Sequence, residues 1–482
     1  MMLISLYTSR VVLQTLGIQD FGIYNIVGGV IVLFSFLNNA MTSSVQRFLN
    51  FELGNKDIKQ AQSYFSASLI IHLCLGLLVI VLGETFGVWF LETYLQIPSE
   101  RENAAFWVLQ FTLLGTFFGI IRTPYNAVII AEERMNVFAI LSVIESMLKL
   151  LIVFLLLLIS YDKLIVYSAL MSFILALISF LYYIMCRKSP IAKYHRCSDH
   201  SLYKKLLNFS IWSLFGSVAN MGASQGVNII LNMFCGVTVN AAMGICNQVQ
   251  GAVSSFLYSF QTAMNPQIVK SYAVGNQNEF HKLLLRTSKY SFFLMHILAL
   301  PIFFCCKDIL SIWLVSVPEY TVEFCKLIII YSLLDSVQGP LWTSVQATGK
   351  IRNYQVLVSV IILANLPMTF LILFLDGSPV WALIIKVALN VLLLVFRTFY
   401  LRQLIQFPVM EFIRKVLVPC VVVAFLGFVI LIVLPCVSNR FLNIAYIIVV
   451  STAISTILFY FIGLDLAEKN LCKSFLKAKF GL

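Results

Sequence analysis

Charged residues are scarce in this sequence: Asp, Glu, Lys and Arg make up only 11% of its 482 residues. Soluble domains carry about 25% charged residues, so the composition excludes an ordinary soluble protein. Hydrophobic residues make up 60%, and the mean hydropathy is +0.93. Apolar runs of about 20 residues, the length that crosses the hydrocarbon core of a bilayer, recur from end to end. The sequence therefore predicts a polytopic membrane protein.

Segments with the alternating pattern of a transmembrane barrel are also missing, and unpaired backbone groups are not tolerated in lipid. We therefore expect an all-α protein. The apolar runs between polar breaks predict fourteen helices, the first of them too short for a full span, at residues 1–16, 22–50, 60–94, 104–131, 137–160, 164–186, 206–235, 240–272, 284–306, 321–347, 354–375, 380–402, 414–436 and 441–463.

Acidic residues are fewer than basic ones, 21 against 33, and the net charge is +12. Nucleic-acid binding would explain such an excess, but its distribution indicates membrane orientation instead. If both termini are cytoplasmic, nearly all basic residues of the connections fall inside, and few fall outside: Arg101, Lys163, Lys307 and Arg440. This asymmetry follows the positive-inside rule. We expect a multi-pass protein of the cytoplasmic membrane that contacts membrane lipids and binds no nucleic acid.

Several kinds of catalytic site are absent. The eleven cysteines lack metal-ligand spacing, and no nucleophile triad, phosphate-binding loop or long outer connection is visible. We therefore expect no enzyme activity, no metal and no cofactor. His72 and His296 are isolated on apolar helices, where we expect each to be simply hydrogen-bonded.

Three phrases occur twice, in the same order, which predicts an internal repeat. They pair Phe21–Asn25 with Met243–Asn247, Phe51–Asp57 with Tyr272–Asn278, and Thr123–Asn136 with Gly339–Asn353. The shift of six helices is even, so the copies share one orientation; parallel repeats of this kind form transporters. The predicted organisation is an N-terminal six-helix lobe (1–186), a cytoplasmic linker (187–205), a second six-helix lobe (206–403), and two additional helices with a basic tail (404–482).

The third repeated phrase contains a proline in each copy, Pro124 and Pro340. Proline removes a backbone hydrogen bond inside a helix and bends it. We therefore expect one bent helix in each lobe, followed by a cytoplasmic turn that carries Arg134 or Lys350.

Polar residues at helical spacing mark helix contacts or a wet cavity in a membrane protein. Such ladders occur on the predicted helices 1, 2, 7 and 8. Tight packing alone explains small residues such as Ser and Gly, but it explains large amides less well. The substrate-binding candidates on these ladders are Asn25, Asn39, Asn220, Gln225, Asn228, Asn247 and Gln250.

Ionisable residues within membrane helices cost about 2.5–3.5 kcal/mol each and are candidates for function. Arg10, Arg47 and Arg122 are candidate substrate-binding cations, because guanidinium suits phosphate oxygens. Glu145 and Lys149 are four residues apart and can pair, so they and Asp335 are candidates for ion coupling or for structural charge. Lys326 and Lys386 lie near outer helix ends, where we expect them only to extend towards the interface.

The helix number, the repeat and the phrase LGIQDFGIYNIVGGV…SSVQRFLNFELGN (Leu16–Asn55) resemble the polysaccharide flippases of the Wzx or O-antigen type. That group belongs to the multidrug/oligosaccharidyl-lipid/polysaccharide exporter (MOP) superfamily, together with the MATE drug exporters. The resemblance implies two lobes in a V, a cavity lined by helices 1, 2, 7 and 8, and alternating access. It also implies that Arg10 and Arg47 engage the diphosphate of an undecaprenyl-linked sugar.

Two functions follow as hypotheses. The first is translocation of a lipid-linked oligosaccharide for surface polysaccharide such as lipopolysaccharide, in company with polysaccharide assembly proteins. The alternative is a MATE-type exporter of small organic cations, coupled to H⁺ or Na⁺. Export of cations requires acidic cavity residues, and the ladder helices carry no Asp or Glu within the membrane, which favours the first hypothesis.

Overall fold

The computed structural model describes residues 11–12, 15–17, 20, 22–24, 35–93, 97–156, 161–195, 199–314, 317–434, 439–466 and 468–470. Helices account for nearly all of these residues, and no strand occurs among them. Contacts within the chain divide it into two compact units, Met1–Ser217 and Val218–Leu482. The expectation of an all-helical membrane protein is confirmed.

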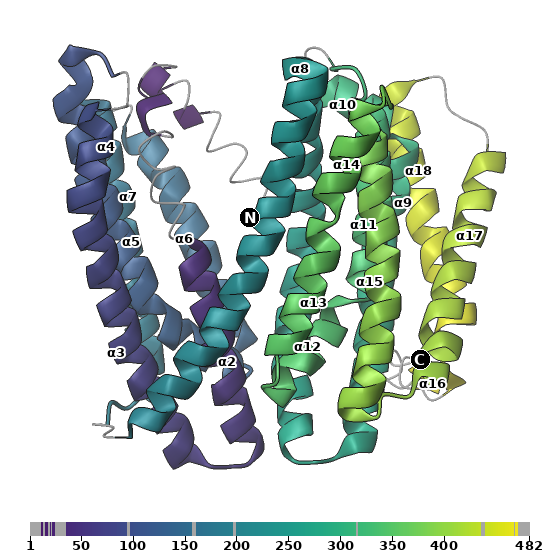
Figure 1. Ribbon diagram of the computed structural model, residues 1–482, viewed down its shortest axis with the longest axis horizontal. Helices are drawn as coiled ribbons and strands as arrows, with labels where there is room; N and C mark the ends of the chain where they lie inside the picture. The colour runs from purple at the N-terminus through teal and green to yellow at the C-terminus, as the bar shows by residue number, and fades with distance from the viewer. Residues whose placement is uncertain are drawn as a thin grey trace. The chain divides into compact units, whose positions relative to one another are not determined.

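The first unit is built around one long helix, α5 (Glu102–Ala131), which packs against its neighbours α2, α3, α6 and α7 (Figure 1). Small residues permit this close packing: a β-carbon at Gly115 would meet Leu175 and the Ser172 backbone of α7. The surrounding helices are α2 (Ser35–Gly54), α3 (Ile58–Leu82) continued by a π-turn (Gly83–Gly87) and α4 (Val88–Thr93), α6 (Met135–Leu155) and α7 (Lys163–Cys186).

Two of these helices begin at side chains that satisfy free backbone N–H groups. Asp57 accepts a hydrogen bond from the backbone of Gln60 at the start of α3, and Asp162 accepts from Leu164 and Ile165 at the start of α7. Such caps satisfy donors that a helix leaves unpaired. Arg101, which precedes α5, forms ion pairs with Asp162 and with Asp20. One guanidinium therefore ties together three segments of this unit.

Helix α8 (His200–Ala273) contains the two predicted helices 206–235 and 240–272. They are separated by a single non-helical residue, Gly236, at φ 77° and ψ −172°. Glycine adopts this conformation readily because it has no β-carbon. The predicted break between the two helices thus occupies one glycine rather than a loop.

The second unit continues with α9 (Gln277–Phe304), which Asn276 caps, and a short helix, α10 (Cys306–Trp313), that the sequence did not predict. The remaining helices are α11 (Thr321–Ser336), α12 (Gly339–Thr348), α13 (Arg352–Leu363), α14 (Asn365–Phe374), α15 (Trp381–Ile405), α16 (Val409–Phe412), α17 (Val418–Val433) and α18 (Arg440–Leu458), with π-turns at Ile413–Leu417 and Phe459–Gly463.

The two prolines of the repeated phrase occupy different helical positions. Pro124 lies inside α5, which stays helical through it. Pro340 lies in the first turn of α12, and α11 and α12 meet at an angle of 41°. The predicted bend is confirmed in the second unit. Gly339 precedes Pro340 at a close approach to α8: a β-carbon there would collide with the side-chain amide of Gln261.

The last two long helices pack against α9. Phe459 stacks on Phe293, with ring centroids 3.8 Å apart. Beyond α18, the carboxylate of Glu468 accepts a hydrogen bond of 2.6 Å from the Lys289 nitrogen of α9, and both side chains are 3% exposed. A buried, charge-balanced pair therefore fixes the segment after α18 to the second unit.

Among the described residues, nine helices are long and apolar enough to span a membrane, or ten if α11 and α12 form one span. Most of the first predicted helix, 1–16, lies outside those residues. The count of fourteen, the two repeats in a V and the domain limits at 186 and 403 stay predictions.

Candidate substrate cavity

A cavity of about 210 Å³ lies within the second unit, between α8, α11, α13, α14 and α15. Its apolar lining includes Val227, Met243, Ile362, Leu389 and Leu393. The polar side chains that line it are Asn220, Ser224, Gln250, Tyr331, Asn365, Lys386 and Asn390. Such a mixture of apolar surface and a few polar groups is typical of small-molecule sites.

Lys386 is the only charged residue among those that line the cavity. Its nitrogen donates a hydrogen bond of 3.4 Å to Gln250 Oε1 on α8 and lies 4.6 Å from the centre of the Tyr331 ring on α11. The interpretation of Lys386 as a side chain that extends towards the interface is therefore wrong. Since α15 begins at Trp381, Lys386 is more than one turn inside the helix and faces the cavity.

An amide network lies beside Lys386. Gln338 Nε2, in the break between α11 and α12, donates to Asn390 Oδ1 at 2.7 Å, and Asn390 Nδ2 donates to Asp335 Oδ1 at 3.4 Å. Asn390 is 2% exposed and Gln338 is fully buried. The network orients Asn390, which lines the cavity, and gives the Asp335 carboxylate its one hydrogen-bond donor among the described residues.

The ladder residues of α8 divide into two groups. Asn220 and Gln250 line the cavity, as does Ser224 of the same ladder. Asn228 donates to Gln225 Oε1 at 3.2 Å, so these two amides pair with each other. Neither Gln225, Asn228 nor Asn247 is among the lining residues.

Other polar residues of the same ladder join helices. Gln261 donates to Ser291 Oγ of α9 and to the Ser336 carbonyl of α11, at 3.2 and 3.1 Å. Asn265 Oδ1 accepts a bond of 2.8 Å from Thr343 of α12. These contacts match the packing interpretation that the sequence left open, since each amide satisfies groups on neighbouring helices.

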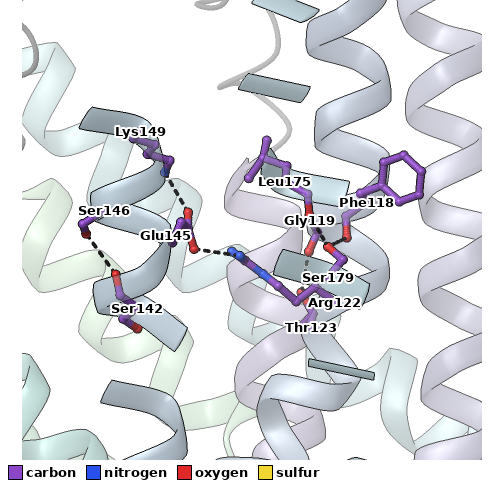
Figure 2. Close-up of polar contacts among 10 residues, drawn as sticks. All are labelled: Phe118, Gly119, Arg122, Thr123, Ser142, Glu145, Ser146, Lys149, Leu175 and Ser179. Atoms are coloured by element: carbon purple, nitrogen blue, oxygen red, sulfur yellow. Dashed lines mark hydrogen bonds and ion pairs between the residues drawn. The ribbon is translucent and has the colours of Figure 1, made fainter. Parts of the chain in front are cut away.

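The first unit holds a cluster of three charges, which we call the α5–α6 triad (Figure 2). Arg122 of α5 donates to Glu145 Oε2 at 2.9 Å, and Lys149 of α6 donates to Glu145 Oε1 at 2.7 Å. The predicted Glu145–Lys149 pair is thus present with a second cation. The Arg122 guanidinium also lies 5.5 Å from the ring of Tyr182 on α7. Arg122 is therefore engaged by protein groups.

The remaining candidates lie elsewhere in the first unit or outside the described residues. The Arg47 guanidinium lies over the rings of Phe48 and Phe51, at 4.5 and 4.8 Å. Arg10 and Asn25 are outside the residues that the structure describes, and of Asn39 only the backbone, in α2, is described.

The histidines and cysteines give a mixed outcome. His72 Nδ1 lies 2.8 Å from the carbonyl oxygen of Ser68, so the expected hydrogen bond is present. His296 is buried beside Gly427, and in the described part of the chain neither of its ring nitrogens has a partner, so the same expectation is wrong there. All described cysteines are free thiols, and no group of side chains that could hold a metal occurs among the residues searched.

The sequence analysis missed Gln338, Asn365, Lys386 and Asn390 as neighbours of one site. A usable signal existed for two of them, since Lys386 and Asn390 are four residues apart and so share one face of α15. Gln338 could also have been noticed, because it directly precedes the Gly339–Pro340 pair, where the sequence predicts a bend in the helix.

Comparison with known proteins supports the fold assignment. A MatE family profile matches residues 213–371, about a third of the chain. No curated protein matches the sequence.

Among solved structures, a MATE protein with a proline-to-alanine mutation has a TM-score of 0.75 and 14% identity, covering 84% of this chain and 92% of the other. A MOP superfamily transporter from Pyrococcus furiosus, described as having a binding pocket of reverse polarity, has a TM-score of 0.72 at 14% identity with the same coverage. A MATE protein in complex with MaD3S has a TM-score of 0.73, again at 14% identity and the same coverage. The chain therefore has the fold of the MATE transporters of the MOP superfamily.

Proposed function

We propose that this protein is a MATE-type membrane transporter that moves an organic solute across the cytoplasmic membrane by alternating access. The observation that carries the proposal is the combination of a transporter fold along 84% of the chain with a polar cavity inside otherwise apolar helices. Polar and charged groups are costly at membrane depth and are typical of a solute pathway. We propose that both termini are cytoplasmic, in accord with the distribution of basic residues.

Ion coupling is part of the proposal, with H⁺ or Na⁺ as the coupling ion. Asp335 is the better candidate of the two membrane carboxylates, because it has only the 3.4 Å contact with Asn390. Glu145 is instead held by two cations, Arg122 and Lys149. A carboxylate that already has two cationic partners gains little from a third.

The test is transport by the purified protein in liposomes under an imposed proton or sodium gradient, with fluorescent organic solutes of both charge signs. We expect gradient-dependent uptake of at least one solute that Asp335→Asn reduces at least about tenfold, the effect typical of a lost proton-transfer group. The matched control is Asp376→Asn, which removes a carboxylate from the turn after α14. Absence of gradient-dependent transport of every solute would refute the proposal.

Translocation of a lipid-linked oligosaccharide is the second candidate, and Lys386 is the observation that favours it. A partly buried ammonium among amides suits a diphosphate and hydroxyl groups better than an organic cation. In this candidate Arg10 and Arg47 would also bind the diphosphate, and polysaccharide assembly proteins would be partners. It is tested by surface glycan in cells: loss with Arg10→Ala at unchanged protein abundance would favour it over export of a soluble solute.

The orientation has its own test. A reporter fused after Lys193, in the linker, should be cytoplasmic, whereas one fused at Ser378, between α14 and α15, should be outside. Finding both on one side would refute the proposed orientation.

A further inference from the structure

The cavity of the second unit has a lining of one charge sign. Its fifteen lining residues include one lysine, Lys386, and no aspartate or glutamate. No carboxylate oxygen of a described residue lies within 4.0 Å of the Lys386 nitrogen. The ammonium is instead held by a 3.4 Å bond to the Gln250 amide and by the face of the Tyr331 ring. The cavity wall therefore carries a cation that has no carboxylate in direct contact, although Asp335 attracts it from beyond 4.0 Å.

The nearest acidic residue in the network does not alter this conclusion. Asp335 binds Asn390 Nδ2 rather than Lys386, and it is not part of the cavity lining. The carboxylate of Asp335 therefore attracts the ammonium only at longer range and forms no ion pair with it. A solute in the cavity meets the ammonium, several amides, a hydroxyl and a tyrosine, but no carboxylate.

The Lys386 ammonium has more hydrogen-bond donors than the described residues have acceptors for it. An ammonium has three N–H donors, and the structure accounts for one of them with the long bond to Gln250. Buried cations are normally paired with an anion, because desolvation of an unpaired charge is costly. A bound anion would supply the missing charge and accept the remaining donors.

We infer that this cavity binds an organic anion, with Lys386 donating to its carboxylate or phosphate group. The inference rests on the proposed transport function and assigns the charge of its solute. The apolar lining, Val227, Met243, Ile362, Leu389 and Leu393, fits the hydrocarbon part of the solute. Asn220, Asn365 and Asn390 offer amides to hydroxyl or carbonyl groups.

The same chemistry is presented by a small soluble anion and by the headgroup of a lipid phosphate. Both end in oxygen atoms that accept charge-assisted hydrogen bonds from an ammonium. A soluble aryl anion and a prenyl diphosphate are therefore separate arms of the test.

Binding is measured by calorimetry on the purified full-length protein in detergent at neutral pH, so that no transport cycle is needed. The probes are benzoate, phenyl phosphate, farnesyl diphosphate and, as a size-matched cation, benzylammonium. We expect at least one anion to bind more than about tenfold tighter than benzylammonium, as the energetics of buried charge pairs imply. Tighter binding of farnesyl diphosphate than of phenyl phosphate would identify a lipid headgroup, and the reverse order a soluble anion.

Variants of Lys386 test whether this lysine is responsible for the binding of anions. Lys386→Gln should weaken binding of the anion at least about tenfold, and Lys386→Arg should restore part of it because the charge is kept. Lys326→Gln is the matched control: this lysine is also on a membrane helix of the second unit, but its ammonium lies over Phe303 and does not line the cavity. It should leave anion binding unchanged.

The inference is overturned if benzylammonium binds as tightly as the anions, if no anion binds, or if Lys386→Gln binds the anion like the unmodified protein. The comparison of probes on the unmodified protein decides the sign of the charge even if Lys386→Gln does not fold. Since the liposome assay tests transport separately, gradient-driven transport of organic cations alone would overturn this inference and leave the proposed transporter function standing.

Discussion

The two units place polar groups differently beside the repeated proline phrase. In the first unit, Arg122 stands two residues before Pro124 and joins the charged α5–α6 triad. In the second unit, Gln338 stands two residues before Pro340 and joins a network of amides that ends at Asp335. The two positions that the predicted repeat pairs thus connect to different helices: α5 to the following helix α6, and the α11–α12 break to α15.

The charge balance differs as well. The triad has two cations for one carboxylate, and its side chains are 19–34% exposed. The second unit places its buried ion pair, Lys289–Glu468, away from the proline, and the partly exposed Arg286 and Asp465 pair with it, so this cluster holds two charges of each sign. The first unit thus places three charges beside its proline, whereas the second unit places amides that end at one carboxylate. The following predictions test how far the two arrangements differ in energy.

The largest effect is expected at the balanced buried pair. Removing one partner from a buried ion pair costs about 3–5 kcal/mol, so Glu468→Gln or Lys289→Met alone should lower stability strongly. The double variant Lys289→Met with Glu468→Met should recover part of the loss, because the charges that remain, Arg286 and Asp465, are of opposite sign and partly exposed. Thermal unfolding of the purified protein measures all three. A double variant less stable than both single variants would show that the pair is more than a charge-balancing contact.

The same pair predicts a pH dependence. Burial raises the pKa of Glu468, but the hydrogen bonds from Lys289 and from the Asp465 N–H outweigh it and hold the pKa below its ordinary 4.5. A lowered carboxyl pKa gives stability that is present above the unfolded pKa and lost as pH falls through the folded one. The contribution should therefore be constant from pH 5 to 8 and fall below about pH 4.5. In Glu468→Gln this acid-dependent part should disappear.

The next largest effect is expected in the triad. Glu145→Gln leaves Arg122 and Lys149 without their carboxylate, and uncompensated charges in a membrane helix cost about 3 kcal/mol each. Lys149→Met leaves the neutral Arg122–Glu145 pair and should cost less than about 1 kcal/mol. Unfolding of the two variants side by side is the measurement. Equal destabilisation by both would mean that the excess cation, rather than the carboxylate, holds α5 and α6 together.

A smaller effect on stability is expected in the hydrogen-bond network of Gln338, Asn390 and Asp335. Asn390→Leu removes the acceptor of Gln338 and the donor to Asp335, and each unsatisfied buried group costs about 1–3 kcal/mol. Ser224→Ala, on the wall of the same cavity, should change stability by less than about 0.5 kcal/mol. The melting temperatures of both variants test this difference. Indistinguishable variants would remove Asn390 from any structural role.

The smallest effect is expected at Pro340. Proline in the first turn of a helix loses no hydrogen bond, because that N–H has no partner inside the helix. Pro340→Ala should therefore change the unfolding free energy by less than about 1 kcal/mol. A loss of several kcal/mol would instead show that the proline itself holds the bend between α11 and α12.

The fold was largely accessible from the sequence because apolar runs and polar breaks report helix limits directly. The predicted 104–131 and 164–186 agree closely with α5 and α7. The short helix α10 was missed because the charged residues Lys307 and Asp308 in its first turn were interpreted as the end of a membrane helix and the start of a connection. The junction at Gly236 is confined to one backbone conformation, and a pattern of side chains does not contain that information.

From the sequence, cavity residues could be grouped only when they lie on the same helix. Asn220 and Gln250 were found because each belongs to a polar ladder, one on either side of Gly236 in α8. Lys386 was misinterpreted because depth along a helix does not say which neighbour its side chain faces. Its contacts come from α8 and α11, residues far apart in sequence, and only the packing of the helices brings them together.

The collision that any side chain at position 339 would have with Gln261 has an evolutionary consequence. Gln261 uses its amide to bind the Ser336 carbonyl at the end of α11. A larger residue at 339 would require the Gln261 side chain to move, and this hydrogen bond would be lost or weakened. Descendants of this sequence could exchange Pro340 at little cost, but not Gly339. Only the proline is common to both copies of the repeated phrase, since Thr123 stands where Gly339 stands in the second. In the second copy we nevertheless expect lineages to keep the glycine rather than the proline.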